Sequence, residues 1–136
     1  MKNIIFLVLT VFLFMECSTV PITGRKRLNL VSDSQVLPAS FAQYQDFLVE
    51  NKLSSNSEMT NQIKNVGKNI SDAVDRFMRA NNMQDEANAY QWEFNLVDDK
   101  TVNAWCMPGG KVVFYTGIMP ICANENGVAA VMGHEV

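Results

Sequence analysis

The sequence is short of the features that would assign it to several large classes of protein. It has 136 residues, with 11 Lys and Arg against 14 Asp and Glu, so its formal net charge is −3 at pH 7. Because basic residues are not in excess, we expect no positively charged surface that would bind phosphates, and nucleic acid is not an expected partner. It also has no internal repeat and no low-complexity tract. An apolar content of 48% and a charged content of 18% are typical of a globular chain with one domain at most.

The sequence also has no apolar run long enough to span a membrane. Ile4–Met15 follows Lys2, and its length fits a signal-peptide core, whereas a spanning helix needs about 20 apolar residues. Cys17 comes directly afterwards, as the lipidated Cys does in bacterial lipoproteins. We therefore predict a lipoprotein signal over residues 1–17, with lipidation at Cys17. Because Glu16 stands where lipoprotein signals carry a small residue, ordinary cleavage nearby and an uncleaved anchor are the alternatives.

The rest of the chain divides into a tether and a domain. Residues 18–31 contain Pro21, Gly24 and three consecutive cations, which favours an extended tether. Residues 32–136 carry the periodic patterns of a folded domain, and we expect its C-terminal part to be missing from this sequence.

Two segments of the domain have the apolar period of amphipathic helices. In the first the apolar side chains on one face are Leu37, Phe41, Tyr44 and Leu48. In the second they are Met59, Ile63, Val66, Ile70, Val74 and Phe77. Ser57 is expected to cap the second helix. Both helices are interpreted as scaffold, because their apolar faces are typical of a core.

The period then changes from that of helices to that of strands. Tyr90–Leu96 alternates apolar and polar side chains, as a half-buried strand does. Val102–Met107 and Lys111–Thr116 are predicted as two further strands, joined by a tight turn at residues 108–110. Because consecutive strands with short turns favour antiparallel pairing, the sequence predicts an α+β fold with a small antiparallel sheet of about three strands.

Histidine is the scarcest residue that carries chemistry, since the sequence contains only His134. It lies in Asn124–Val136, where a capping Asn precedes apolar residues at helical spacing, so the segment is predicted to be a helix. His134 and Glu135 are the first two letters of H-E-x-x-H. In that motif two His on one helix face bind a zinc ion, and the Glu is the general base for the metal-bound water.

Three segments together resemble one family of peptidases. They are Asn103–Lys111, which reads N-A-W-C-M-P-G-G-K, then Y-T-G at 115–117, and V-M-G-H-E at 131–135. In this order and at this spacing they resemble the gluzincin metallopeptidases of the CAAX prenyl protease and HtpX type. The likeness is closest to the soluble, lipoprotein-like branch that includes the BepA-like and LoiP-like bacterial peptidases.

The resemblance implies that residues 32–136 are the N-terminal part of a zincin-like metallopeptidase domain. His134 corresponds to the first zinc ligand and Glu135 to the general base. The implied reaction is hydrolysis of peptide bonds, in which Zn²⁺ polarises the scissile carbonyl and lowers the pKa of its bound water to about 7. Glu135 then takes the proton from that water and passes it to the leaving amine.

The resemblance also implies a surface for the substrate. The residues that correspond to the strand and turn beside the cleft are Asn103, Ala104, Gly109 and Gly110. In zincins an edge strand over the site pairs with an extended substrate backbone, which is strand addition in physical terms. Val112–Tyr115 and Val102–Cys106 are the two candidates for that strand, and the sequence does not choose between them.

The sequence departs from the family pattern in its metal ligands. It has no second His, and no Glu from a later helix follows as the third ligand. Catalytic zinc normally has three protein ligands and a water. We therefore expect a fragment cut within its motif, which as written is inactive and binds no metal.

The resemblance further implies partners and a location for the complete enzyme. Its substrates would be proteins or peptides, in particular misfolded or membrane-associated envelope proteins handled in protein quality control. A lipid anchor would hold it in the bacterial cell envelope, facing the periplasm or the exterior.

Two other functions remain open on the sequence. A non-catalytic exported lipoprotein could keep the same scaffold as a binding module. Alternatively, Cys106 could be a nucleophile with His134 as its base. Cys106 and Cys122 could also pair as a disulfide or remain free thiols.

Overall fold

The computed structural model describes residues 17–19, 26–28 and 33–136. The chain divides into two units, Met1–Gln35 and Val36–Val136, and each is described by itself. Within the described ranges, no helix combines the length and the apolar character that crossing a bilayer requires.

The first unit contains a short pair of strands. β1 (Cys17–Thr19) and β2 (Lys26–Leu28) pair antiparallel; apart from Cys17, they lie within the segment 18–31 that was predicted to be an extended tether. The predicted signal core, Ile4–Met15, lies outside the described residues. Lipidation of Cys17 stays a prediction.

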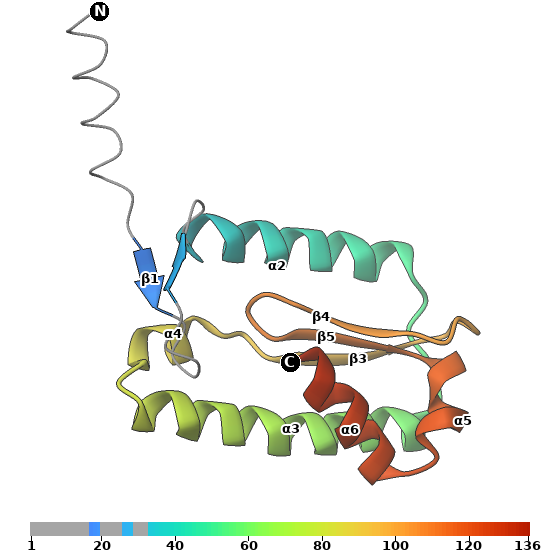
Figure 1. The fold of residues 1–136 in the computed structure, drawn as a ribbon. Coiled ribbons are helices and arrows are strands. Elements are labelled where there is room, and N and C mark those ends of the chain that lie inside the picture. Colours follow the sequence, from blue (N-terminus) through green and yellow to red (C-terminus); the bar gives the residue numbers. More distant parts are fainter. Residues whose placement is uncertain (1–16, 20–25, 29–32) are drawn as a thin grey trace, which may run out of the picture. The chain divides into compact units, whose positions relative to one another are not determined.

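The second unit has three layers (Figure 1). α2 (Asp33–Glu50) covers one face of a three-stranded sheet, and two further helices cover the other face. The strands of the sheet are β3 (Glu93–Val97), β4 (Ala104–Met107) and β5 (Lys111–Tyr115). The two helices are α3 (Ser57–Ala80) and α6 (Glu125–Glu135). The predicted α+β class is therefore confirmed.

α3 forms where its apolar stripe predicts it. Its N-cap is Asn56, one residue before the predicted Ser57, and the Asn56 Oδ1 accepts a hydrogen bond from the amide of Met59 at 3.0 Å. This satisfies one of the free amides of the first turn. Ile63 and Val66 are buried against the sheet, so the stripe is core, as expected.

The sheet has the order β3-β5-β4 and is mixed, because β5 is antiparallel to β4 and parallel to β3. The prediction of a wholly antiparallel sheet was wrong in this respect. β5 is the most buried strand, with Val112, Val113 and Phe114 apolar on both faces, so it takes the central position. Once β5 lies between β3 and β4, β3 runs in the same direction as β5, because each turn reverses the chain.

The alternation of side chains along the strands separates two cores. The core between the sheet and α3 and α6 includes Leu96, Val112, Phe114, Val128 and Met132. The core between the sheet and α2 is built around Tyr44, Val97 and Val113. Each face of the sheet is therefore covered, and the polar side chains of β3 on the α2 side are not a solvent face.

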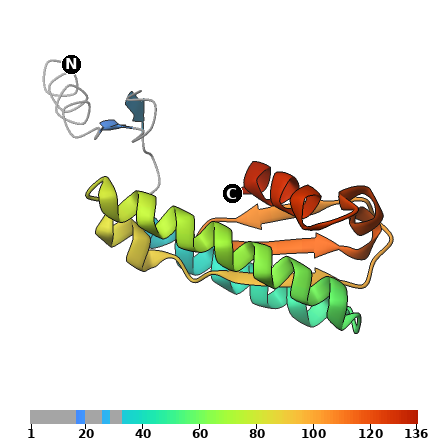
Figure 2. The ribbon, with the colours of Figure 1, turned by 90° about the horizontal axis from the view of Figure 1, so that it is seen from below.

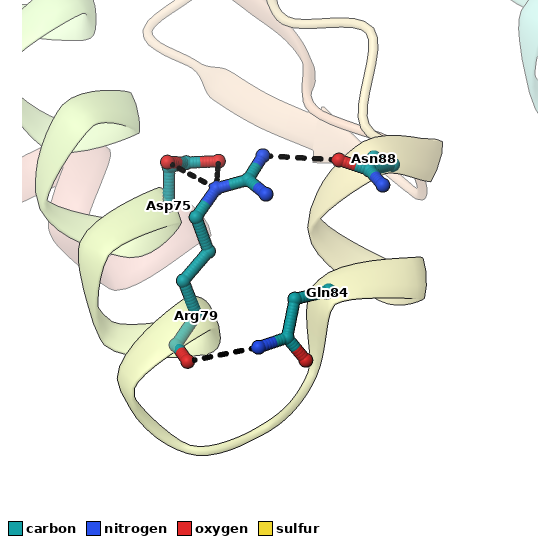
Figure 3. A network of polar contacts seen from close by, with 4 residues as sticks. All are labelled: Asp75, Arg79, Gln84 and Asn88. Carbon is teal, nitrogen blue, oxygen red and sulfur yellow. Dashed lines mark hydrogen bonds and ion pairs between the residues drawn. The ribbon is translucent and has the colours of Figure 1, made fainter.

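A short helix that the sequence did not predict, α4 (Gln84–Ala89), turns the chain from α3 towards β3. Figure 3 shows how Arg79 joins the two helices. Its Nε donates to both Asp75 oxygens, at 3.0 and 2.9 Å, and its Nη2 donates to Asn88 Oδ1 at 3.0 Å. Gln84 Nε2 donates to the Arg79 carbonyl at 3.3 Å. These bonds fix the direction in which the chain enters the sheet.

A second unpredicted connection leads from β5 into α6. It consists of the 3-10 helix η1 (Thr116–Ile118) and the one-turn helix α5 (Met119–Cys122). The carbonyl of Asp99 accepts from the Gly117 amide at 2.9 Å and from the Thr116 hydroxyl at 2.7 Å. This holds the connection against the loop between β3 and β4, and so sets where α6 begins.

Candidate active site

α6 carries the His-Glu pair on a helix that is fixed at its start and on its inner face. The Asn124 Oδ1 accepts from the amides of Asn126 and Gly127, at 2.9 and 3.3 Å, as the sequence predicted. Val128 and Met132 are completely buried. His134 is exposed and Glu135 is half-buried, so both side chains of the pair lie at the surface end of an anchored helix.

The outer side of α6 is open in the part of the chain that the structure describes. Gly133 and Ala130 are exposed, and a Cβ added at Gly133 would meet no heavy atom within 4 Å. Within residues 33–136 these small residues leave space beside the His-Glu pair.

The strand topology separates the two candidates for the substrate strand. β5 is hydrogen-bonded on both sides, whereas β4 pairs with β5 alone among the described strands. Figure 2 shows β4 at the margin of the sheet, next to α6. Of these two candidates, only β4 has an edge to which an extended peptide could add.

The register of the hairpin gives the direction of the backbone groups of β4. The Tyr115 amide donates to the Asn103 carbonyl at 3.1 Å. Hydrogen-bonded and non-hydrogen-bonded pairs alternate along antiparallel strands, so Trp105 bonds with Val113, its partner in the register. The N–H and C=O groups of Ala104 and Cys106 therefore point to the free edge.

Cys106 lies where the edge strand approaches α6, close enough to Glu135 to sense its charge. Its side chain lies on the α6 side of the sheet and packs against that core. Burial raises the pKa of the Cys106 thiol to about 11, and the negative charge of Glu135 adds to the rise. The carboxylate of Glu135 is thus close to the strand residue whose backbone faces the open edge.

The same observations disfavour Cys106 as a nucleophile. A nucleophilic Cys needs a lowered pKa, and here the pKa is raised. The Cys106 Sγ donates to the carbonyl of Met107 at 3.4 Å. Cys122 is buried, and both residues are free thiols.

Cys106 is expected to react about a hundredfold more slowly with iodoacetamide at pH 8 in the folded chain than in urea. The reason is that a pKa of about 11, against 9.0 for an unperturbed thiol, lowers the thiolate fraction by about that factor. The folded rate should still rise with pH above 9, where that of the unfolded chain levels off. Mass spectrometry of the peptide that contains Cys106 measures both rates, and equal rates would contradict the assignment.

The other predicted substrate residues occupy different environments. Asn103 is exposed at the start of β4, and Ala104 is buried with its backbone on the free edge. Gly109 and Gly110 lie in the β4–β5 turn with φ of 86° and 85°. A Cβ on Gly109 would meet Phe41 of α2, and one on Gly110 would meet Trp92 at 2.6 Å. Both glycines therefore face the scaffold.

A buried polar cluster on the α2 side was missed by the sequence reading. The Lys111 side chain is 7% exposed, and its Nζ lies 3.3 Å from Glu93 Oε2 and 5.1 Å from the centre of the Phe41 ring. Asn95 Nδ2 donates to the Tyr44 hydroxyl at 3.0 Å and to Glu93 at 2.9 Å. The alternation on β3 predicts a half-buried strand with its polar side chains towards solvent, and only the position of α2 reveals the cluster.

The residues present do not complete a zinc site. Within the described ranges there is no group of three or more His, Cys, Asp or Glu side chains placed to hold a metal ion. His134 is also the one His of the sequence. The chain therefore offers one imidazole, whereas catalytic zinc normally has three protein ligands.

A helix that ends in His-Glu beneath the edge strand of a small mixed sheet defines the N-terminal part of a zincin-like metallopeptidase domain. Residues 64–136 match the model of the family described as Peptidase family M48. The chain belongs to this family.

Relatives of the chain carry the names of metalloendopeptidases. The mitochondrial metalloendopeptidase OMA1 of Schizosaccharomyces pombe is 33% identical over 125 residues, which are 92% of this chain and 35% of that protein. The protein of the same name from Saccharomyces cerevisiae is 49% identical over 47 residues, 33% of this chain and 14% of its own length. The human metalloendopeptidase OMA1, mitochondrial, is 23% identical over 130 residues, 96% of this chain and 24% of its own length. The chain thus spans about a third of the first relative's length.

These relatives correct the expected location. All three are named as mitochondrial proteins, so the prediction of a bacterial cell-envelope lipoprotein is wrong, and the comparisons do not support the lipoprotein-like branch. A short apolar segment followed by a Cys does not specify a compartment, because its length is compatible with more than one kind of address.

Proposed function

We propose that the protein containing this chain is a zinc-dependent metalloendopeptidase that hydrolyses extended segments of other proteins. The observation that carries the proposal is the meeting of β4 and α6 at Cys106. There a strand with a free edge, which can hold a substrate backbone, contacts α6, and the charge of Glu135 on that helix reaches Cys106. Membership of family M48 supports the same reaction.

In this proposal each residue of the candidate site has one role. The amides and carbonyls of Ala104 and Cys106 pair with the substrate backbone, in antiparallel orientation, and the exposed side chain of Asn103 contacts the substrate at the start of β4. Glu135 accepts a proton from the attacking water. His134 supplies one metal ligand, and the remaining ligands come from residues outside this sequence. Because one imidazole does not retain zinc, the 136-residue chain alone is inactive.

The proposal extends to the kind of substrate. A strand edge pairs with an extended backbone and cannot pair with a helix or with a strand already in a sheet. The substrates we propose are therefore unfolded or partly unfolded proteins, which agrees with a role in protein quality control.

Gly109 and Gly110 support the substrate strand in this proposal. The positive φ of Gly109 suits the third position of a type II turn, which the Gly110 amide closes on the Met107 carbonyl at 3.3 Å. The turn holds β4 in the hairpin and leaves its other edge free.

The test is hydrolysis of an unfolded protein such as reduced casein by the complete protein, with and without a chelator. Ala104→Pro removes the amide that points to the free edge but leaves the bonds to β5 in place. Since one backbone hydrogen bond contributes about 1 kcal/mol, KM should rise about fivefold with little change in kcat.

The outcomes separate the proposal from the binding-module alternative. Hydrolysis that a chelator stops and added zinc restores supports a metallopeptidase. Binding of casein without any cleavage would leave the binding module as the function. Unchanged KM in Ala104→Pro, with the variant folded, would contradict the assignment of the edge.

A further inference from the structure

The two faces of β4 present different side chains to a strand that adds at its edge. Ala104 and Cys106 face α3 and α6, whereas Trp105 and Met107 face α2. Directly opposite residues of paired strands point to the same side of a sheet. Every second residue of a bound peptide would therefore lie on the α2 side, next to a large side chain.

The position opposite Trp105 is the closest of these contacts. The backbone groups of Trp105 are used in the pairing with Val113 on β5. On the free edge Trp105 therefore forms a non-hydrogen-bonded pair, in which the Cα atoms are about 4.5 Å apart and the side chains are closer than in the alternate pairs. The residue opposite Trp105 must fit against the indole.

Trp105 is held in place by the aromatic side chains around it. Its ring lies 4.9 Å from that of Phe47 at 82°, and 6.2 Å from that of Tyr44 at 86°. Its Nε1 donates to the Tyr115 hydroxyl at 3.2 Å. The indole is half-buried, so part of it remains accessible. Because both α2 and β5 fix the ring, it offers a wall that is already formed before a peptide binds.

We propose that Trp105 determines substrate specificity by selecting an apolar side chain at the peptide position opposite it. This inference rests on the proposed peptidase function. A branched or aromatic side chain gains a cross-strand contact with the indole. A charged side chain at that peptide position would lose hydration, and the aromatic side chains around Trp105 offer it no partner. The selected position is one residue from the one opposite Cys106, which lies beside Glu135.

The experiment is a positional scan with the complete protein. The probes are seven-residue peptides that alternate Thr and Val, with Leu, Phe, Asp or Lys placed at one position at a time. We expect one position at which kcat/KM for Leu or Phe exceeds that for Asp or Lys about tenfold. Trp105→Ala should reduce this preference to about twofold, and Trp105→Phe should retain most of it. Val49→Ala, at an exposed residue of α2, is the control and should keep the wild-type profile.

The possible results distinguish a failure of the inference about Trp105 from a failure of the proposed peptidase function. If the wild-type protein cleaves the peptides with no position that prefers apolar residues, the inference fails. It also fails if Trp105→Ala, folded as judged by its melting curve, keeps the wild-type profile. If Trp105→Ala does not fold, the wild-type scan and Trp105→Phe still decide. If the wild-type protein cleaves no peptide and no unfolded protein, the proposed function itself fails.

Discussion

Replacing Glu135 by Gln is expected to lower peptide hydrolysis by the complete protein about a thousandfold or more. The amide of Gln has nearly the same shape as the carboxylate but cannot accept the proton of the attacking water. General-base catalysis typically contributes about 10²–10⁴ in rate. Glu135 is half-buried at the last turn of α6, so the change should leave the fold intact. The measurement is kcat for casein-derived peptides, with zinc content determined on the same sample.

Glu125→Gln is the matched control, because Glu125 lies in the first turn of the same helix and is exposed. Losing its favourable interaction with the helix dipole costs about 0.5 kcal/mol of stability, and its activity should equal that of the wild type. A Glu135→Gln variant with wild-type kcat and full zinc content would remove Glu135 from the mechanism.

Gly109→Ala is expected to destabilise the 136-residue chain by about 3 kcal/mol. A non-Gly residue in the left-handed region costs about 1–2 kcal/mol, and the φ of Gly109 is 86°. The added Cβ would also meet the Phe41 ring and Leu37 of α2, and overpacking a core costs about 1–3 kcal/mol. Urea denaturation measures the difference.

Gly133→Ala provides the opposite case with the same chemical change. Gly133 is helical and its Cβ would enter open space, so Ala should stabilise the chain by about 0.5–1 kcal/mol. If the two variants shift the midpoint equally, the turn geometry does not have the effect assigned to it.

Local patterns were sufficient to predict most of the elements. The apolar stripe of Ile63, Val66 and Ile70 predicted α3, and the capping Asn124 predicted the start of α6, because both signals act within a few residues. α4 and α5 were missed because six- and four-residue helices are too short for the helical period to be recognised.

Long-range pairing could not be read from the same patterns. The parallel alignment of β3 with β5 depends on which strand takes the centre of the sheet, and the sequence shows only that each strand is apolar enough to be buried. The polar alternation of Glu93 and Asn95 indicated solvent, whereas α2, more than forty residues earlier, covers them and Lys111.

The candidate site likewise has a part that local patterns predict and a part that depends on long-range pairing. The sequence singled out His134 and Glu135 through their motif, but it left two strands as candidates for the substrate edge. Only the strand order excludes β5, and only the register identifies the free groups of Ala104 and Cys106. The role proposed for Trp105 needs both, since Trp105 has no motif of its own.

The open edge of β4 also has a consequence for the protein as a solute. Natural sheets often protect an exposed edge with charged side chains or Pro, which discourage a second molecule from pairing there. The residues of β4, Ala104–Met107, include neither. Their backbone groups do not distinguish the main chain of a substrate from the main chain of another copy of the protein. The free strand edge that peptide binding requires therefore also gives the protein a tendency towards self-association, through the same four residues.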